Sequence, residues 1–475
     1  MNLALKAEVD RIIKEFELPD ESLPGLVDLF IKSATEGLSC ESSGKSCMPM
    51  IPTFVTNIPT GREKGILLAA DLGGTNFRVC SVALNGDHTF KLLQSKNPIP
   101  VDLMSSTSAE LFSYLAGKIG AFVKTHHSDK FNGDEAGDRL KLGFTFSFPV
   151  EQSAIDSGKL IRWSKGFNIP DTVGKDVVSL LQEQLDRLQV PVHVAALAND
   201  TVGTLLARAY TGADKEGSTS IGCIFGTGTN GAYCEKLENI KKLPKEIVDK
   251  LKSNGIFEMV INTEWGSFDN NLELLPVTKY DAQIDKLSTN PGYHLFEKRV
   301  SGMFLGEILR NVLIDLHSQG LILTSYATYD TLPHRIKTPW LLSSEGLSLF
   351  EIDDSTKLRA TELELKNMLR LPTTYEERVA IQEITRAISK RAAHLAAVPI
   401  TALLIKLDAF KGHHTEVDVG ADGSVVEFYP GFRTMMRDAV ASTQLGPKGE
   451  RRLHINISKD GSSVGAALCA LSTKL

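Results

Sequence analysis

The sequence has almost no excess of charge. Its 52 Lys and Arg residues nearly balance 58 Asp and Glu residues, so the formal net charge is -6 over 475 residues. Proteins that hold nucleic acid or anionic membranes by electrostatics concentrate Lys and Arg on one face. The near balance of charge gives no sign of such a basic surface, so we expect neither nucleic acid nor a membrane as a partner.

Cysteine is scarce, and long apolar runs are absent. The six cysteines form no CxxC pair and no metal-ligand pattern with histidine. The first turns carry Lys6 and Arg11 rather than the apolar region of a signal peptide. The longest apolar stretch, residues 395–405, is too short and interrupted to span a bilayer. We expect a soluble protein of the reducing cytoplasm.

What is present is the composition of a globular α/β protein. Apolar residues make up 42% and charged residues 23%. A chain of 475 residues exceeds what one core usually organises, which favours two large domains. Helical apolar spacing predicts helices over 9–16 and 379–397, and apolar runs interrupted by glycine turns predict paired strands over 65–84 and 220–233.

The first glycine turn follows a short apolar run and has the residues of a phosphate cradle. Gly73 and Gly74 let backbone N–H groups approach an anion, and Thr75 and Asn76 add side-chain donors. Asp71 is placed to hold Mg²⁺ through water. The turn is neither a GxxxxGK[ST] loop nor a GxGxxG fingerprint. By itself it is more simply interpreted as a plain hairpin turn, because such turns are common.

A second turn repeats this pattern about 150 residues later. It reads Gly226-Thr227-Gly228-Thr229-Asn230, between two apolar runs. Two such turns on paired strands can hold a triphosphate from opposite sides. A third cluster, residues 420–424, is a candidate for the nucleoside end, although a β-turn before a strand at 425–428 is the simpler interpretation.

Polar residues elsewhere are candidates for binding and activating an acceptor. Asp200 follows an apolar strand and precedes a helical pattern, a position that suits both N-capping and catalysis. Spacing alone does not show that the other candidates converge. These are Ser147, Lys165, Asn199, Asn230, Glu264 and Glu297.

Nine segments in order resemble the hexokinase family of the actin-like ATPase superfamily, and most of all its fungal glucokinases. They are LAADLGGTNFRVCSV (68–82), LGFTFSFPV (142–150), LIRWSKGF (160–167), LANDTVGT (197–204), IGCIFGTGTNGAY (221–233), NTEWGSFD (262–269), PGYHLFEKRVSGMFLGE (291–307), VGADGSVVEFYPGF (419–432) and DGSSVGAAL (460–468). The resemblance implies two actin-like (ribonuclease H-like) α/β domains flanking a deep cleft. The implied small domain comprises 62–200 plus 446–475, and the large domain 1–61 plus 201–445.

The resemblance also assigns roles. Asp200 is the implied general base, assisted by Lys165. The implied sugar contacts are Ser147, Ser164, Lys165, Asn199, Asp200, Asn230, Glu264 and Glu297. The implied phosphate- and metal-binding residues are Asp71, Gly73, Gly74, Thr75, Asn76, Thr227, Gly228 and Thr229. The implied nucleoside-binding residues are Gly420, Ser424, Gly461 and Ser462. The cofactors are ATP and Mg²⁺, with Asp71 reaching the metal through water.

Two positions depart from the family pattern. Ser164 stands where the family commonly has Thr, which keeps the hydroxyl. Ser463 replaces the second glycine of the last motif. If that position requires a positive φ, serine costs about 1 kcal/mol or more.

We therefore expect ATP-dependent phosphorylation of glucose and mannose at the 6-hydroxyl, the first step of glycolysis, by a monomer or weak homo-oligomer. One alternative is a broad-specificity hexokinase that also uses fructose. Another is an actin- or chaperone-like ATPase, or a sugar sensor, without kinase activity. An ATPase without a sugar site has no need for the Asn199-Asp200 pair or for Glu264 and Glu297.

Overall fold

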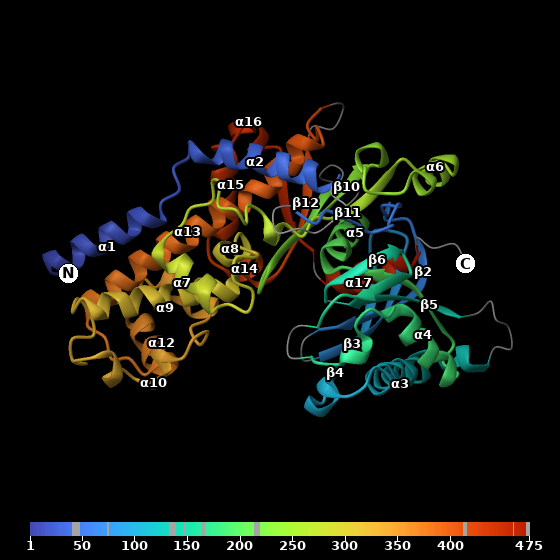
Figure 1. Ribbon diagram of the computed structural model, residues 1–475, viewed down its shortest axis with the longest axis horizontal. Coiled ribbons are helices and arrows are strands. Elements are labelled where there is room, and N and C mark those ends of the chain that lie inside the picture. The colour runs from blue at the N-terminus through green and yellow to red at the C-terminus, as the bar shows by residue number, and fades with distance from the viewer. Residues whose placement is uncertain are drawn as a thin grey trace.

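The computed structural model describes residues 1–39, 48–73, 76–132, 139–146, 148–163, 167–212, 219–411, 416–458 and 460–471. Five predicted site residues lie outside the described residues: Gly74, Thr75, Ser147, Ser164 and Lys165. The described chain forms a five-stranded and a six-stranded sheet with helices around them (Figure 1), as expected of an α/β protein.

The five-stranded sheet has the order β4-β3-β2-β5-β8. Its strands are β2 (Lys64–Leu72), β3 (Asn76–Asn85), β4 (Phe90–Pro98), β5 (Leu140–Phe146) and β8 (Val192–Ala198). Strands β2 to β4 are antiparallel neighbours, and β5 runs parallel to both β2 and β8. A separate hairpin pairs β6 (Val150–Ala154) with β7 (Ser157–Leu160).

Both faces of this sheet are buried. Leu68 and Ala70 of β2 join a core with helices α3 (Ser108–His126) and α4 (Val177–Arg187). Leu67 and Ala69 point to the opposite face, where they join the core around α5 (Asp200–Gly212) and α17 (Gly461–Leu471). Alternate side chains of a strand point to opposite faces, so a strand covered on both sides is a continuous apolar run.

The six-stranded sheet has the order β1-β11-β10-β9-β12-β13. Its strands are β1 (Ile51–Pro52), β9 (Thr219–Phe225), β10 (Thr229–Lys236), β11 (Glu258–Asn262), β12 (Val417–Asp422) and β13 (Leu453–Ile457). Strand β12 is parallel to β9 and β13, whereas β9, β10 and β11 are antiparallel. Strand β13 thus belongs to this sheet, although the expected small domain included its residues.

Helices α5 and α17 lie between the two sheets (Figure 1) and pack on each other. Their contact is glycine on glycine. A Cβ added to Gly465 of α17 would lie 2.0 Å from the Cα of Gly203 in α5. Helix α17 also packs on β2, β5 and β8, while α5 packs on β9, β10 and β12. The helix pair therefore joins the two sheets.

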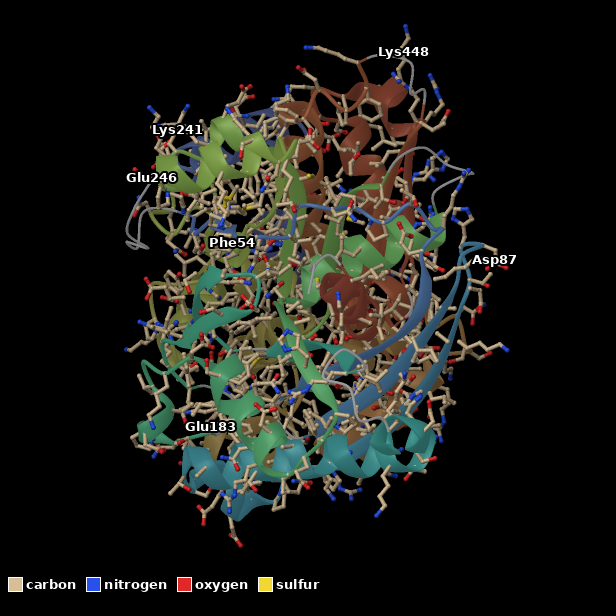
Figure 2. All side chains as sticks on the ribbon, turned by 90° about the vertical axis from the view of Figure 1, so that its right-hand side faces the viewer. Phe54, Asp87, Glu183, Lys241, Glu246 and Lys448 are labelled. Atoms are coloured by element: carbon tan, nitrogen blue, oxygen red, sulfur yellow. The ribbon has the colours of Figure 1, made fainter. Side chains whose placement is uncertain are left out.

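The remaining helices surround the six-stranded sheet or extend away from it. They are α1 (Leu3–Phe16), α2 (Ser22–Gly37), α6 (Lys245–Ser253), α7 (Lys279–Leu287), α8 (Glu297–Val300), α9 (Gly302–Ser318), α10 (His334–Lys337), α11 (Ser344–Ile352), α12 (Arg359–Leu369), α13 (Tyr375–Lys406), α14 (Ser424–Phe428), α15 (Phe432–Ala441) and α16 (Gly446–Glu450). Figure 2 shows Lys241 and Lys448 at one end of the molecule and Glu183 of α4 at the other, with Phe54 between them.

Two of these helices were predicted by periodicity. Helix α1 buries Val9, Ile12 and Phe16, and α13 covers the predicted 379–397. Within the described ranges, α13 is the one helix with the length and composition to cross a membrane, but 89% of its most apolar window is buried inside the protein, as in a core helix. The strand considered at 425–428 is wrong: Gly423, with φ +114°, ends β12 and the chain enters α14.

Candidate functional site

The carboxyl ends of β2, β5 and β8 share one edge of the five-stranded sheet, because these strands are parallel. Asp71 lies in β2 directly opposite Thr145 of β5. Asn199 and Asp200 follow β8 at the same edge. In open parallel sheets this edge is where ligands bind.

Asn199 and Asp200 together begin helix α5. The Asn199 Oδ1 accepts from the backbone N–H of Thr201 at 2.9 Å and from its hydroxyl at 2.5 Å. One carboxylate oxygen of Asp200 shares that same N–H at 2.9 Å. Asn199 therefore does much of the capping, so the Asp200 carboxylate is not required for it alone.

A network of three side chains lies next to this edge: Asn230 of β10, Asn262 of β11 and Glu264, which follows β11. Asn230 Nδ2 donates to Asn262 Oδ1 at 2.8 Å and to Glu264 Oε1 at 3.1 Å, and Asn262 Nδ2 donates to the same Glu264 oxygen at 2.7 Å. Glu264 has φ +52°, a left-handed conformation that costs a non-glycine residue about 1 kcal/mol or more. The carboxylate is thus held in one orientation at a strained position.

The charges around Glu264 show which groups converge on it. Burial raises the pKa of Glu264, and the nearby carboxylates of Asp200 and Glu297 raise it further, whereas the Asn262 hydrogen bond and His294 lower it. Asp200 comes from the other sheet's edge. The structure therefore brings Asp200, Glu264 and Glu297, three of the predicted sugar contacts, into one electrostatic neighbourhood.

Glu297 connects this neighbourhood to the second glycine turn. Its Oε2 accepts from the backbone N–H of Thr229 at 3.1 Å, and its Oε1 lies 3.2 Å from His294 Nδ1. A Cβ at Gly228 would lie 2.7 Å from Glu297 Oε2. Only glycine leaves room for the carboxylate at this turn.

The second turn also contacts the third glycine cluster. Gly226 N–H donates to Gly228 O at 2.9 Å. A Cβ added to Gly226 would lie 3.3 Å from the Gly423 Cα and 3.4 Å from the Ser424 backbone nitrogen. Thr227 is exposed, whereas the Thr229 hydroxyl is buried and accepts from the Trp265 indole at 2.9 Å. The two threonines predicted for phosphate thus differ: one faces solvent and one is engaged in the core.

The described part of the first turn lies beside the last motif. Gly73 N–H donates to Asn76 O at 3.1 Å and closes the hairpin. Thr145 Oγ1 donates to Ser462 O at 3.4 Å. Burial raises the pKa of Cys80, and the carboxylates of Asp71 and Asp460 raise it further.

The structure bears on two further positions, Gly420 and Ser463. Gly420 lies inside β12, where a Cβ added to it would meet Arg208 and Thr204 of α5, and its nucleoside contact stays a prediction. Ser463 lies within α17 and is not among the residues with positive φ, so its expected strain is absent. Burial raises the pKa of Cys80, and the neighbouring Ser463 side chain lowers it.

Asp422 belongs to the third cluster, residues 420–424, but the sequence analysis did not single it out among the candidate site residues. Burial raises its pKa, the Gly423 N–H bonds its Oδ1 at 2.6 Å, and the carboxylates of Asp200 and Asp460 act on it. Its place at the end of β12, just before the glycine, was the available signal. Within the described ranges, no group of three or more His, Cys, Asp or Glu residues has metal-site geometry.

Aromatic side chains bracket the segments of Ser147 and Lys165. Phe146, Phe148, Trp163 and Phe167 contact one another, with Trp163 and Phe167 stacked at 5.1 Å between ring centroids. The Trp163 indole donates to Ile169 O at 2.8 Å. The flanks of both segments are therefore anchored in the core of the five-stranded sheet.

Comparison with family models decides the family. One hexokinase model matches residues 8–210, and a second matches residues 220–472. The chain belongs to the hexokinase family. It is an enzyme of the hexokinase and glucokinase class, as the motifs predicted.

Individual hexokinases and glucokinases resemble the chain over nearly its full length. Glucokinase-1 of Saccharomyces cerevisiae is 57% identical, covering 98% of this chain and 96% of that protein. Hexokinase-1 of the same organism is 39% identical, covering 99% and 93%. The chain is thus nearer in sequence to that glucokinase than to that hexokinase.

A solved hexokinase structure shares the fold. The hexokinase from Schistosoma mansoni, complexed with glucose, superimposes with a TM-score of 0.83 at 35% identity and covers 99% of both chains. The predicted fold class, two actin-like domains, is confirmed by this likeness.

Proposed function

We propose that this hexokinase transfers the γ-phosphoryl group of ATP to the 6-hydroxyl of glucose, with mannose as a second substrate, as the first step of glycolysis. The supporting observation is the approach of Asp200 to Glu264, a carboxylate held by Asn230 and Asn262. Hexose hydroxyls need fixed donors and acceptors, and the attacking hydroxyl needs a nearby base.

Asp200 is our proposed general base. Its carboxylate stands at the sheet edge where the acceptor must meet the phosphate turns, and it accepts the proton as the hydroxyl oxygen attacks phosphorus. Asn199, Asn230, Glu264 and Glu297 are proposed to orient the sugar. Ser147, Ser164 and Lys165 remain proposed contacts, with Lys165 assisting at the transferred group.

The phosphates are proposed to lie between the two turns, with the nucleoside towards Ser424 and the start of α17. Negative charge gathers here: Asp71 and Asp460 raise the pKa of Cys80, and Asp460 raises that of Asp422. A cation fits such a field, and Mg²⁺ commonly binds through one or two carboxylates together with phosphates and water. Mg²⁺ there would neutralise phosphate charge, and Asp71 would hold it through water.

The domain division follows the sheets. We propose a small domain of 62–200 with α17 and a large domain containing the rest, with the boundary between β13 and α17. This differs from the expected boundary at 446, because β13 pairs with β12. The proposed location is the cytoplasm, and the proposed state is a monomer or weak homo-oligomer.

The test is a coupled assay of the purified protein with ATP and glucose, mannose or fructose. We expect Asp200→Ala to lower kcat by about 10²–10⁴-fold while glucose affinity changes little, because the lost step is proton transfer. Asp249→Ala, an exposed aspartate on α6, is the matched control. Near-normal turnover of Asp200→Ala would refute the base assignment.

The same assay separates the alternatives. Fructose turnover close to that of glucose would identify a broad-specificity hexokinase. ATP hydrolysis that is equally fast with and without sugar would identify an ATPase instead. Sugar binding without turnover would identify a sensor.

A further inference from the structure

A buried asparagine, Asn262, lies beside the Glu264 carboxylate and is not among the predicted sugar contacts. It is the last residue of β11, which pairs with β10 on one side and with β1 on the other. The residue is 5% exposed. A strand paired on both sides keeps its residues in fixed register, so the Asn262 side chain starts from a fixed position.

The carboxylate determines which way the two neighbouring amides point. An ionised carboxylate only accepts hydrogen bonds. The atoms that face Glu264 Oε1, at 3.1 and 2.7 Å, are therefore the Nδ2 atoms of Asn230 and Asn262. This leaves Asn262 Oδ1 to accept from Asn230 Nδ2 at 2.8 Å. The three side chains form a closed ring of hydrogen bonds in which each donor and acceptor is fixed.

The donors in this ring show which atom stays open to a ligand. Asn230 Nδ2 carries two hydrogens, and both are donated within the ring. Glu264 Oε1 accepts two N–H groups, whereas Oε2 accepts from no residue that the structure describes. Glu264 Oε2 is thus the atom left to meet a ligand, and it suits a group that donates, such as a hydroxyl.

The ring also favours the ionised form of this buried carboxyl. Burial raises the pKa of Glu264, and the charges of Asp200 and Glu297 raise it further. Among the groups that lower this pKa, the Asn262 hydrogen bond contributes most, ahead of the charge of His294. An ionised Glu264 remains an acceptor, which a hydroxyl donor requires.

We propose that Asn262 is a positioning residue for hexose binding. It fixes Glu264 so that Oε2 faces the ligand as an acceptor, and a sugar hydroxyl donates to that oxygen. Asn262 acts on the sugar through Glu264 and not by contact. The inference rests on the proposed function, since it takes Glu264 as a sugar contact.

Asn262→Asp tests this role, because it replaces a donor by an acceptor of nearly equal size. Two carboxylates that share a site repel unless one is protonated, and a protonated carboxyl donates as the amide did. Isothermal titration calorimetry with glucose, without ATP, measures the Kd. We expect near-normal affinity at pH 5.5 and affinity weaker by about tenfold or more at pH 8.5. Asn262→Ala supplies neither donor nor charge, so its loss should be equal at both pH values.

The other titratable groups near Glu264 are common to all these proteins. They are Asp200, Glu297, His294 and Tyr293, and burial and the Glu264 charge raise the pKa of Tyr293. The ratio of Kd values between variant and unaltered protein at each pH therefore reports the substitution alone. Asn367→Asp, at an exposed position in the last turn of α12, is the matched control and should leave this ratio at one.

A double-mutant cycle separates positioning from general damage. Glu264→Ala leaves no carboxylate to hold, so adding Asn262→Ala should change the glucose Kd by less than about twofold. Additive losses in this cycle would overturn the proposal. So would an Asn262→Asp affinity that is normal at both pH values or equally weakened at both. If Asn262→Ala fails to fold, as its thermal midpoint would show, Asn262→Asp and its pH comparison decide.

The binding experiment and the coupled assay fail separately. Glucose binding that follows this pattern without phosphoryl transfer in the coupled assay would refute the proposed kinase and support the role of Asn262. Absence of glucose binding by the unaltered protein would overturn both.

Discussion

At the scale of single residues, the site depends on side chains whose charge or size is constrained by one close neighbour. Gly228 faces Glu297, and Glu264 is held by two asparagines in a left-handed conformation. Asn230 bonds both Asn262 and Glu264 and also accepts from the Gly231 N–H at 2.7 Å. Substitutions at such positions are poorly tolerated, because moving one side chain directly displaces the side chain that it contacts.

The first prediction concerns Gly228. Gly228→Ala places a methyl 2.7 Å from Glu297 Oε2, which displaces the carboxylate from the Thr229 N–H. We expect kcat/KM for glucose to fall by about 10²-fold, a size typical of misplacement near 1 Å. Steady-state kinetics measures it. Gly117→Ala in α3, where a Cβ meets nothing within 4 Å, should keep full activity; equal losses in both variants would contradict the argument.

The second prediction concerns pH and the Asp281–Arg391 pair. Burial alone would raise the pKa of Asp281, but Arg391 lowers it to about 2. A carboxyl whose folded pKa lies below its unfolded value stabilises above the unfolded value, near 4, and loses this as pH falls towards 2. We expect Asp281→Asn to cost about 3–5 kcal/mol at pH 7, because it leaves a buried cation unpaired.

Thermal unfolding at pH 7, 4 and 3 measures this difference between the unaltered protein and Asp281→Asn. The difference in free energy of unfolding between the two proteins should stay constant from pH 7 to about 4 and become smaller below pH 4. Glu183→Gln, an exposed position visible in Figure 2, is the control with no expected gap. A gap that widens as pH falls below 4 would have the wrong sign.

At the scale of elements, the pair of helices between the sheets sets the geometry of the site. Helix α5 begins at Asp200, and α17 begins at Gly461 beside the first turn. Small residues at their crossing let the backbones approach closely, and Gly143 of β5 likewise meets the Ala466 backbone. The distance between these helix starts therefore depends on the absence of side chains at the crossing.

Gly465→Ala tests this crossing. The new Cβ would lie 2.0 Å from the Gly203 Cα. Because that neighbour is backbone, one of the two helices has to shift. We therefore expect the protein to be destabilised by about 3 kcal/mol or more and to lose turnover. Urea unfolding and kinetics measure the two effects. In Gly25→Ala the added Cβ meets only Leu274 at 3.7 Å, and stability should be kept or slightly raised. An unchanged unfolding midpoint for Gly465→Ala would show that the crossing adapts.

At the scale of the whole molecule, the proposed sugar contacts come from both sheets. Asn199 and Asp200 follow the five-stranded sheet, while Asn230 and Glu264 belong to the six-stranded side. A ligand that contacts both sides favours the arrangement in which they are close. Closing around sugar also excludes water, which is the competing nucleophile.

Sugar-induced closure is the prediction at this scale. We expect glucose to reduce the radius of gyration in small-angle X-ray scattering and to slow tryptic cleavage, including cleavage at Lys165. A non-substrate sugar alcohol such as sorbitol, at equal concentration, should do neither. Identical scattering and digestion with and without glucose would contradict closure.

The sequence by itself determined the α/β class, the long helices, the two glycine turns and, through ordered motifs, the family. These are local patterns, since periodicity and turn composition are set by neighbours along the chain. Only the tertiary structure decided that Thr229 accepts from Trp265, that Gly420 packs against α5, that the charges of Asp200 and Asp460 act on Asp422 and that β13 completes the larger sheet. Each depends on contacts between segments far apart in the chain, which spacing does not encode.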